Sequence, residues 1–225
     1  MVSLAKEVPV GTGAYTVQEV ARFARMHPVT ARRWFFGSNM GAAIVPAQTD
    51  DRYLSFLDFM QAIAVRNLRV QHHIALPTIR EALKFAKDEF NLDHPFARMH
   101  HTYLDGKKII IHPASQPAPI QATGKGRGQH VMKPVLETYL VQTSFDPASG
   151  LACNYVAYQF KDRRVMMNPE YHFGQPYVEG AGISAKRLAD AVLEEGGFDA
   201  AAEAFAVSVD DVQAAYNYID DLKVA

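Results

Sequence analysis

The sequence feature that most constrains the fold is the stretch of residues 15–36, YTVQEVARFARMHPVTARRWFF. Thr16 followed by Glu19 is a capping box, in which each side chain bonds the backbone amide of the other residue and so begins a helix. Apolar residues then recur at spacings of three and four, which predicts an amphipathic helix of about nine residues. Pro28 suits the first position of a second helix, where its missing amide hydrogen is not needed. The stretch therefore predicts two short helices joined by a tight turn.

The second helix of this pair has two different faces. Ala31, Trp34 and Phe35 form its predicted inward stripe. Its outer face lies near the amino-terminal end that a helix-turn-helix protein presents to base edges in the major groove. Arginine pairs bidentately with guanine, and threonine contacts bases or phosphates. We therefore interpret the pair as a DNA-reading unit, the alternative being an ordinary surface pair that happens to carry arginines. The predicted DNA contacts are Thr16, His27, Val29, Thr30, Arg32, Arg33, Arg52, Arg66 and Arg69.

Residues 37–55 follow as a short, glycine-containing segment with a strand-like end, Arg52-Tyr53-Leu54. Between two helices, this length and composition predict a wing, a small hairpin that lies along the phosphate backbone, with Arg52 as its contact. Ser55 and Asp58 then form a second capping box, which begins a helix with one apolar face. A turn leads to another amphipathic helix over residues 77–90. The apolar face of the first of these helices is assigned to Phe56, Phe59, Met60, Ile63 and Ala64.

The order helix, helix, wing, helix, helix is carried by two strings, YTVQEVARFARMHPVTARRWF and YLSFLDFMQAIAVRNLRVQHHIALPTIREALKF. With these strings, about 75 residues of a predicted domain at 1–92 resemble the DNA-binding domain of the MerR family of transcriptional regulators. The resemblance implies a winged helix-turn-helix domain that binds double-stranded operator DNA. The long dimerising helix of that family has no counterpart here, because the chain breaks at NLDHPFARMHH and no heptad repeat follows.

We predict that residues 93–163 form a central β-rich region that connects two domains. A hairpin is predicted around Asp105 and Gly106, since this dipeptide between β-prone runs is a strong hairpin signal. Residues 113–130 are rich in proline and glycine and predict a mobile loop. Further on we expect a short helix at 134–140 and two strands joined by the turn DPASG. Tyr155 and Tyr158 are expected either on the packed face of that sheet or stacked on bases.

Charge divides the chain into a basic front and an acidic back. Residues 1–133 hold 17 Lys and Arg against 10 Asp and Glu, whereas residues 134–225 hold 6 against 14. The balances are +7 and −8, although the whole chain carries only −1. Cations attract phosphate and anions repel it, so the two ends suit different partners, unless the segregation arose by chance.

We predict that residues 164–225 form an extended segment, a turn and then three short helices. The helices are predicted to begin at Ser184, Asp199 and Ser208, with Asp211 completing a capping box with Ser208. The Gly-x-Pro-x-Val-x-Gly run from Gly174, followed by helix, loop, helix and Ser-Val-Asp-Asp-Val, resembles the carboxy-terminal domain of VapB-type antitoxins of bacterial toxin–antitoxin pairs. That resemblance implies a small PIN-like ribonuclease toxin as partner.

This carboxy-terminal domain also has the outline of a second helix-turn-helix. Asp210 and Asp211, however, stand where a DNA reader needs cations, and helix capping is a sufficient structural reason for them. We therefore assign the domain to protein contact or dimerisation. The residues expected to carry this contact are Val209, Val212, Tyr216 and Ile219.

Catalytic and metal-binding chemistry finds little support in the sequence. Adjacent histidines such as His72 and His73 point in different directions, and Cys153 is the single cysteine, so we expect no metal site and no cofactor. No Gly-x-Ser-x-Gly elbow is present, and we expect no enzyme. No apolar run is long enough to span a bilayer, so we expect no membrane partner. The opening MVSLAKEVPV lacks the apolar core of a signal peptide and the chain has one cysteine, so we expect a cytoplasmic protein.

The expected fold is α+β and mainly helical, with a domain at 1–92, a connecting region at 93–163 and a domain at 164–225. The expected function is that of a DNA-binding antitoxin that neutralises a PIN-like ribonuclease and regulates its own operon, acting as a homodimer. Two alternatives stay open. One is a stand-alone MerR-like transcriptional regulator whose carboxy-terminal domain mediates homodimerisation, and the other is an interaction protein whose helix-turn-helix has lost its DNA role.

Overall fold

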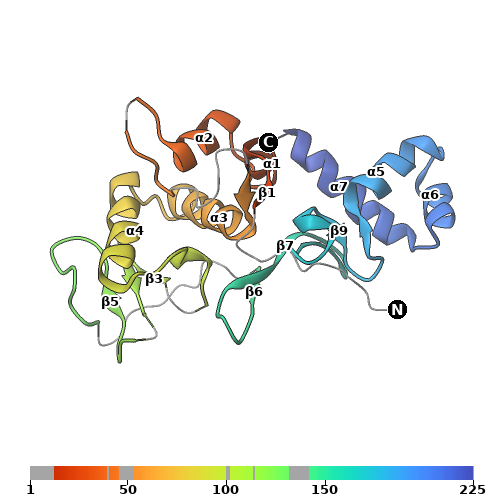
Figure 1. The fold of residues 1–225 in the computed structure, drawn as a ribbon. Coiled ribbons are helices and arrows are strands. Elements are labelled where there is room, and N and C mark those ends of the chain that lie inside the picture. The colour runs from red at the N-terminus through yellow and green to blue at the C-terminus, as the bar shows by residue number, and fades with distance from the viewer. Residues whose placement is uncertain are drawn as a thin grey trace.

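A computed structural model describes residues 13–39, 41–45, 53–99, 102–113, 115–131 and 142–224 of the chain (Figure 1). It has the expected α+β class, because helices are combined with antiparallel sheets. The helix expected at 134–140 lies outside the described residues. The amino-terminal elements are β1 (Gly13–Tyr15), α1 (Val17–Phe23), α2 (Pro28–Phe36), β2 (Leu54–Ser55), α3 (Phe56–Val70), α4 (Leu76–Phe90) and the 3-10 turn η1 (Pro95–Ala97).

Helix α3 is the centre of the amino-terminal core. Its predicted capping box is confirmed, because Ser55 Oγ accepts the Asp58 amide and the Asp58 carboxylate accepts the Ser55 amide. The expectation of one apolar face was too narrow, since the buried residues lie around most of the helix. Even the polar Gln61 is buried, and its Oε1 accepts the amide of Phe96 in η1 at 2.9 Å. Elements from several parts of the chain therefore enclose α3.

A three-stranded antiparallel sheet, in the order β3-β4-β5, packs beside α4. The hairpin predicted at Asp105 and Gly106 is confirmed: Asp105 pairs with Lys108, and Gly106 takes a φ of 57° in the two-residue loop. Residues 113–130 were expected to form only a loop, but they contribute β5, and the amide of Gly124 donates to Glu81 of α4 at 3.2 Å. The strands are β3 (Thr102–Asp105), β4 (Lys108–Ile111) and β5 (Ile120–Gln121).

A five-stranded antiparallel sheet, in the order β10-β9-β8-β7-β6, joins the central and carboxy-terminal regions. The two strands predicted around the turn DPASG are β6 and β7. The expected domain boundary between residues 163 and 164 falls inside the β7–β8 hairpin, because Phe160 pairs with Arg163. The strands are β6 (Thr143–Phe145), β7 (Ala152–Phe160), β8 (Arg163–Met167), β9 (Tyr177–Val178) and β10 (Ile183–Ser184), and the 3-10 turn η2 (His172–Gly174) separates β8 from β9.

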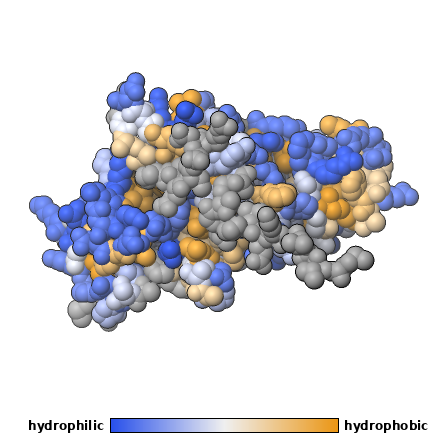
Figure 2. Space-filling model, in the orientation of Figure 1, coloured by the Kyte–Doolittle hydropathy of each residue, from blue (hydrophilic) through white to orange (hydrophobic). Residues whose placement is uncertain are grey.

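Three helices end the chain, as the sequence predicts: α5 (Ala185–Glu194), α6 (Phe198–Phe205) and α7 (Val209–Val224). Ser184 is the N-cap of α5, and Ser208 forms the predicted capping box with Asp211 before α7. Helix α6 begins two residues earlier than expected, because Gly197 is its N-cap and Asp199 lies within its first turn. In Figure 2, apolar surface gathers at the end of the molecule formed by α6.

Helix α7 runs from this end towards α1 (Figure 1). Its carboxy terminus lies beside α1 in Figure 1. Tyr218 of α7 is 1% exposed, and its ring lies 6.1 Å from the ring of Tyr158 in β7. Tyr155 of the same strand contacts the Phe59 ring of α3 edge-on at 5.7 Å, so both tyrosines belong to the packed side of the sheet. One hydrophobic core therefore runs through both halves.

Candidate nucleic-acid interface

Helices α1 and α2 form the predicted two-helix unit. At the start of α1, Thr16 Oγ1 accepts the Glu19 amide at 3.2 Å and Glu19 Oε2 accepts the Thr16 amide at 2.7 Å, which confirms the capping box. In the turn between the helices, Arg25 has a left-handed backbone conformation with a φ of 52°, which reverses the direction of the chain. The Met26 amide closes the turn by donating to the carbonyl of Ala21 at 2.9 Å. Local hydrogen bonds thus set both the start of α1 and the turn after it.

Helix α2 has the two faces that its sequence predicts. Ala31, Trp34 and Phe35 are buried, and the outer face is open: Val29 is 50% exposed, Arg32 and Arg33 are exposed, and Thr30 is partly exposed. Pro28 stands at the first helical position. The imidazole Nδ1 of His27 accepts the amide of Val29 at 3.2 Å, so this predicted DNA contact is also the N-cap of α2.

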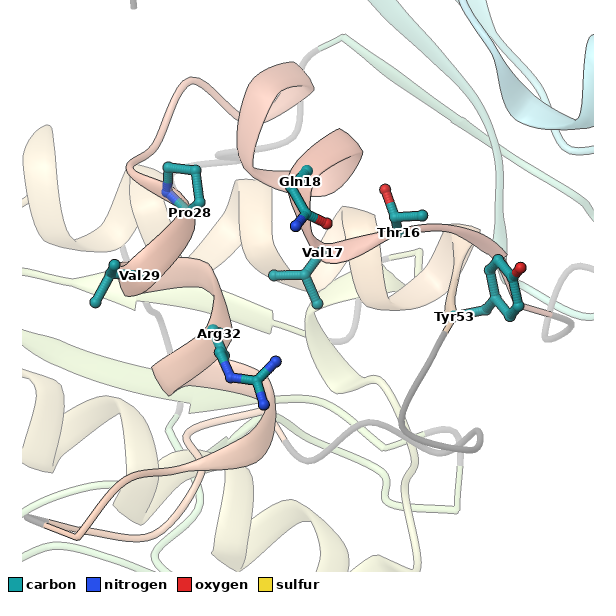
Figure 3. Close-up of a pocket in the computed structure, with 7 residues that line it drawn as sticks. All are labelled: Thr16, Val17, Gln18, Pro28, Val29, Arg32 and Tyr53. Atoms are coloured by element: carbon teal, nitrogen blue, oxygen red, sulfur yellow. The ribbon is translucent and has the colours of Figure 1, made fainter.

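A hollow of about 340 Å³ lies between the starts of α1 and α2 (Figure 3). Val17 and Gln18 of α1 line it on one side and Val29 and Arg32 of α2 on the other, with Tyr53 at one end. The guanidinium carbon of Arg32 lies 5.8 Å from the centre of the Phe36 ring. This is a cation–π distance, and the contact restrains the cation at the edge of the hollow. Thr16 and Pro28 complete the lining.

Four residues of this hollow were not predicted as contacts, namely Val17, Gln18, Pro28 and Tyr53. The sequence could have indicated Gln18, because it is a polar residue two positions after the predicted N-cap Thr16. The structure shows it exposed in the first turn of α1. Tyr53 follows the residues 46–52 that lie outside the described part of the chain, and it is 53% exposed. No local pattern in the sequence places Tyr53 at this hollow, because it comes beside Thr16 through the pairing of the next residue, Leu54, with Tyr15 of β1 (Figure 3).

Arg66 and Arg69 of α3 bind backbone carbonyls within the protein. The Nε of Arg66 donates to the carbonyl of Arg25 in the α1–α2 turn at 3.1 Å, and Nη1 of Arg69 donates to the carbonyl of Ile74 at 2.8 Å. Both arginines therefore brace turns, one of them within the two-helix unit. The assignment of Arg66 and Arg69 as DNA contacts stays a prediction. In the structure both side chains stabilise turns of the protein.

The wing is described only in part, and Arg52 lies outside the described residues. After α2, a short bridge pairs Ser38 with Gly41. The amides of Ile44 and Val45 both donate to the carbonyl of Trp34, so the chain runs back along the end of α2. Leu54 pairs with Tyr15 of β1. Its expected strand-like character is therefore confirmed, since it belongs to β2, and the wing itself stays a prediction.

The residues expected to carry partner contact on α7 are distributed between core and surface. Val212 is fully buried in the core, so it is not available on the surface of this structure and that expectation is corrected. Tyr216 is partly buried, and its ring meets Phe198 of α6 edge-on at 5.3 Å. Ile219 is partly buried as well, whereas Val209 is 37% exposed.

The acidic start of α7 is neutralised within the protein. Asp210 pairs with Lys161 at 2.7 Å, and Asp211, which is buried and caps the helix, lies 3.5 Å from Nε of Arg163. Both cations belong to the β7–β8 hairpin. The start of this helix is thus occupied by the protein's own cations.

Among the described residues, no group of three or more His, Cys, Asp and Glu side chains is arranged to hold a metal ion; His100 and His101 lie outside them. Burial raises the pKa of the Cys153 thiol, which keeps it in the unreactive protonated form. In the described part of the chain, no helix has both the length and the hydropathy to cross a membrane. Three of the predicted DNA contacts, Thr16, Val29 and Arg32, line one hollow, which makes the surface between α1 and α2 the candidate site.

Comparison with known proteins bears on both the sequence and the fold. No family model matches the chain. It is 30% identical over 92 residues to VapB45 of Mycobacterium tuberculosis, a protein named as a candidate antitoxin. This match spans 41% of the present chain and 38% of the relative. The crystal structure of Rv2018 from Mycobacterium tuberculosis has a TM-score of 0.63 at 21% identity, covering 91% of this chain and 97% of that one, so the two share a fold.

Proposed function

We propose that this chain is a DNA-binding antitoxin that neutralises a small PIN-like ribonuclease and regulates its own operon as a homodimer. The observation that carries the DNA part is the outer face of α2. Arg32, Arg33 and Val29 are exposed beside a hollow of about 340 Å³, while the opposite face anchors the helix in the core. This is the arrangement by which a helix-turn-helix protein enters the major groove.

The antitoxin part is supported by the similarity to VapB45 and by charge. The acidic groups at the start of α7 are paired internally, but Glu195, Asp199 and Glu203 on and between α5 and α6 are exposed. An RNA-cleaving protein presents basic surface to its substrate, and an acidic surface is complementary to it. We therefore assign the toxin-binding surface to α5 and α6, because the inward side of α7 is buried in the core.

Binding to the DNA upstream of the protein's own coding sequence tests the first part. Fluorescence anisotropy compares this duplex with a shuffled duplex for the wild type and for Arg32→Ala with Arg33→Ala. We expect the variant to lose discrimination, by about 1–3 kcal/mol for each bidentate base contact. Lys84→Ala removes an exposed cation of α4 that pairs with Asp88, and serves as the matched control. Equal discrimination in the wild type and the double variant would remove both arginines from the reader role.

A pull-down of the tagged protein from its native cells after nuclease treatment tests the second part. A small ribonuclease recovered in near-stoichiometric amount supports the antitoxin function. Recovery of the protein alone, as a stable homodimer, would instead favour the stand-alone regulator whose carboxy-terminal region only dimerises it.

A further inference from the structure

The turn around η2 has an unusual backbone. Three consecutive residues have positive φ angles: His172 at 48°, Phe173 at 55° and Gly174 at 80°. The left-handed region is unfavourable for bulky residues, and such residues persist in it only where surrounding contacts hold them. Here the ring Nε2 of His172 lies 2.8 Å from the carbonyl of Gly182, and the Gly174 amide donates to the carbonyl of Tyr171 at 2.9 Å. These hydrogen bonds therefore hold the turn in one conformation, and its positive φ angles restrict which residues can occupy it.

Gly174 places this turn against the amino-terminal core. The phenol of Tyr15 donates to the carbonyl of Gly174 at 2.8 Å, across 159 positions of sequence. A Cβ atom at Gly174 would collide with the Tyr15 oxygen, so only glycine permits the contact. Tyr15 is itself fully buried, with its ring packed against Phe23 and Phe59. The carboxy-terminal region is thus seated directly on a residue of β1, just before α1.

The next residue, Gln175, reaches the capping box of α1. Its Nε2 donates to Glu19 Oε1 at 2.9 Å. The other oxygen of the same carboxylate, Oε2, accepts both the amide and the hydroxyl of Thr16. Gln175 therefore orients the carboxylate that closes the first turn of α1. Thr16 and Val17, at the start of that turn, line the hollow beside α2.

The other end of α1 is held from the same half of the chain. Arg25, in the α1–α2 turn, lies 3.5 Å from the carboxylate of Asp221 near the end of α7. Figure 1 shows this end of α7 beside α1. Residues of the carboxy-terminal region consequently contact both ends of the first helix of the two-helix unit.

We propose that Gly174 and Gln175 are positioning residues for the DNA interface: the carboxy-terminal region sets the start of α1 and, through it, the affinity for DNA. This inference rests on the proposed DNA binding and adds the regulation of the same site. The turn at Gly174-Gln175-Pro176, where the Gly-x-Pro-x-Val-x-Gly run begins, then helps to position the DNA-reading unit.

The full-length variant Gln175→Glu tests the link, because it sets a second carboxylate against Glu19 without changing the size of the side chain. Two quantities are measured: hydrogen exchange of the amides in the first turn of α1, and affinity for the upstream duplex. We expect faster exchange in that turn and an affinity lower by roughly two- to tenfold. Gln159→Glu is the matched control, since Gln159 is an exposed residue of β7 that bonds the Lys161 carbonyl.

The double variant Glu19→Gln with Gln175→Glu provides a rescue. Glutamine at this position closes capping boxes as glutamate does, and its amide donates to the new carboxylate. Exchange and affinity should both return towards wild-type values. Wild-type exchange and affinity in Gln175→Glu overturn the proposal, as does faster exchange with unchanged affinity. Absence of DNA binding by the wild type overturns the proposed function, and the exchange data then still report whether Gln175 holds the start of α1.

Discussion

Replacing Tyr15 with phenylalanine removes one hydroxyl from the contact between the two halves of the protein. The aromatic ring and its packing against Phe23 and Phe59 stay, so no cavity of consequence forms. What is lost is the 2.8 Å hydrogen bond to Gly174, whose carbonyl is then left buried without this donor. An unsatisfied buried polar group costs about 1–3 kcal/mol. For a chain of this size, each kcal/mol lowers the melting temperature by about 2–4 °C.

Urea denaturation followed by circular dichroism measures this loss. We expect the midpoint to fall while the slope is retained, since the surface exposed on unfolding is unchanged. Tyr171→Phe is the control, because Tyr171 is 54% exposed. Loss of its hydroxyl should change the stability by less than about 0.5 kcal/mol. If Tyr15→Phe were as stable as this control, the hydrogen bond between Tyr15 and Gly174 would not hold the two halves together.

Two further predictions concern the core and pH. Val212→Ala should destabilise the protein by about 2 kcal/mol in thermal unfolding, because it leaves a cavity in the core. The partly exposed Val209, changed to alanine, should cost less than about 0.5 kcal/mol. Equal effects of the two would mean that Val212 is not in the core. Burial lowers the pKa of His94, against the opposing effect of Asp58 at 3.9 Å. The unfolded chain therefore binds the proton more readily, and stability should fall as the pH drops below about 6.5. His94 has a φ of 51°. Asparagine tolerates such a positive angle, so His94→Asn should reduce this pH dependence in urea titrations, and an unchanged slope would assign it to other groups.

The internal pairing of the acidic start of α7 bears on the resemblance of the carboxy-terminal region to a second helix-turn-helix. A reader helix needs an open, positively charged amino-terminal end. Here Lys161 and Arg163 of the β7–β8 hairpin lie against Asp210 and Asp211. The described start of α7 therefore lacks the open cationic end of a reader helix, and the assignment of this region to protein contact stays a prediction.

Local patterns in the sequence predicted the starts of helices and the tight turns. The capping boxes of Thr16 with Glu19, Ser55 with Asp58 and Ser208 with Asp211 all form, because each joins residues only three positions apart. The hairpin loop at Gly106 forms for the same reason, since its geometry depends on neighbouring residues. Short-range bonds such as these need no information about the rest of the chain.

Tertiary structure decided what the faces of these elements contact. Periodicity indicated one apolar face for α3, but elements distant in the sequence cover most of its circumference. The same limitation applies to Arg66, which bonds a carbonyl 41 positions away, and to Val212, whose burial depends on how α7 packs. The contact of Tyr15 with Gly174 spans 159 positions. A local pattern shows which residues are apolar or charged, but which of them meet is set by the packing of distant segments into one core.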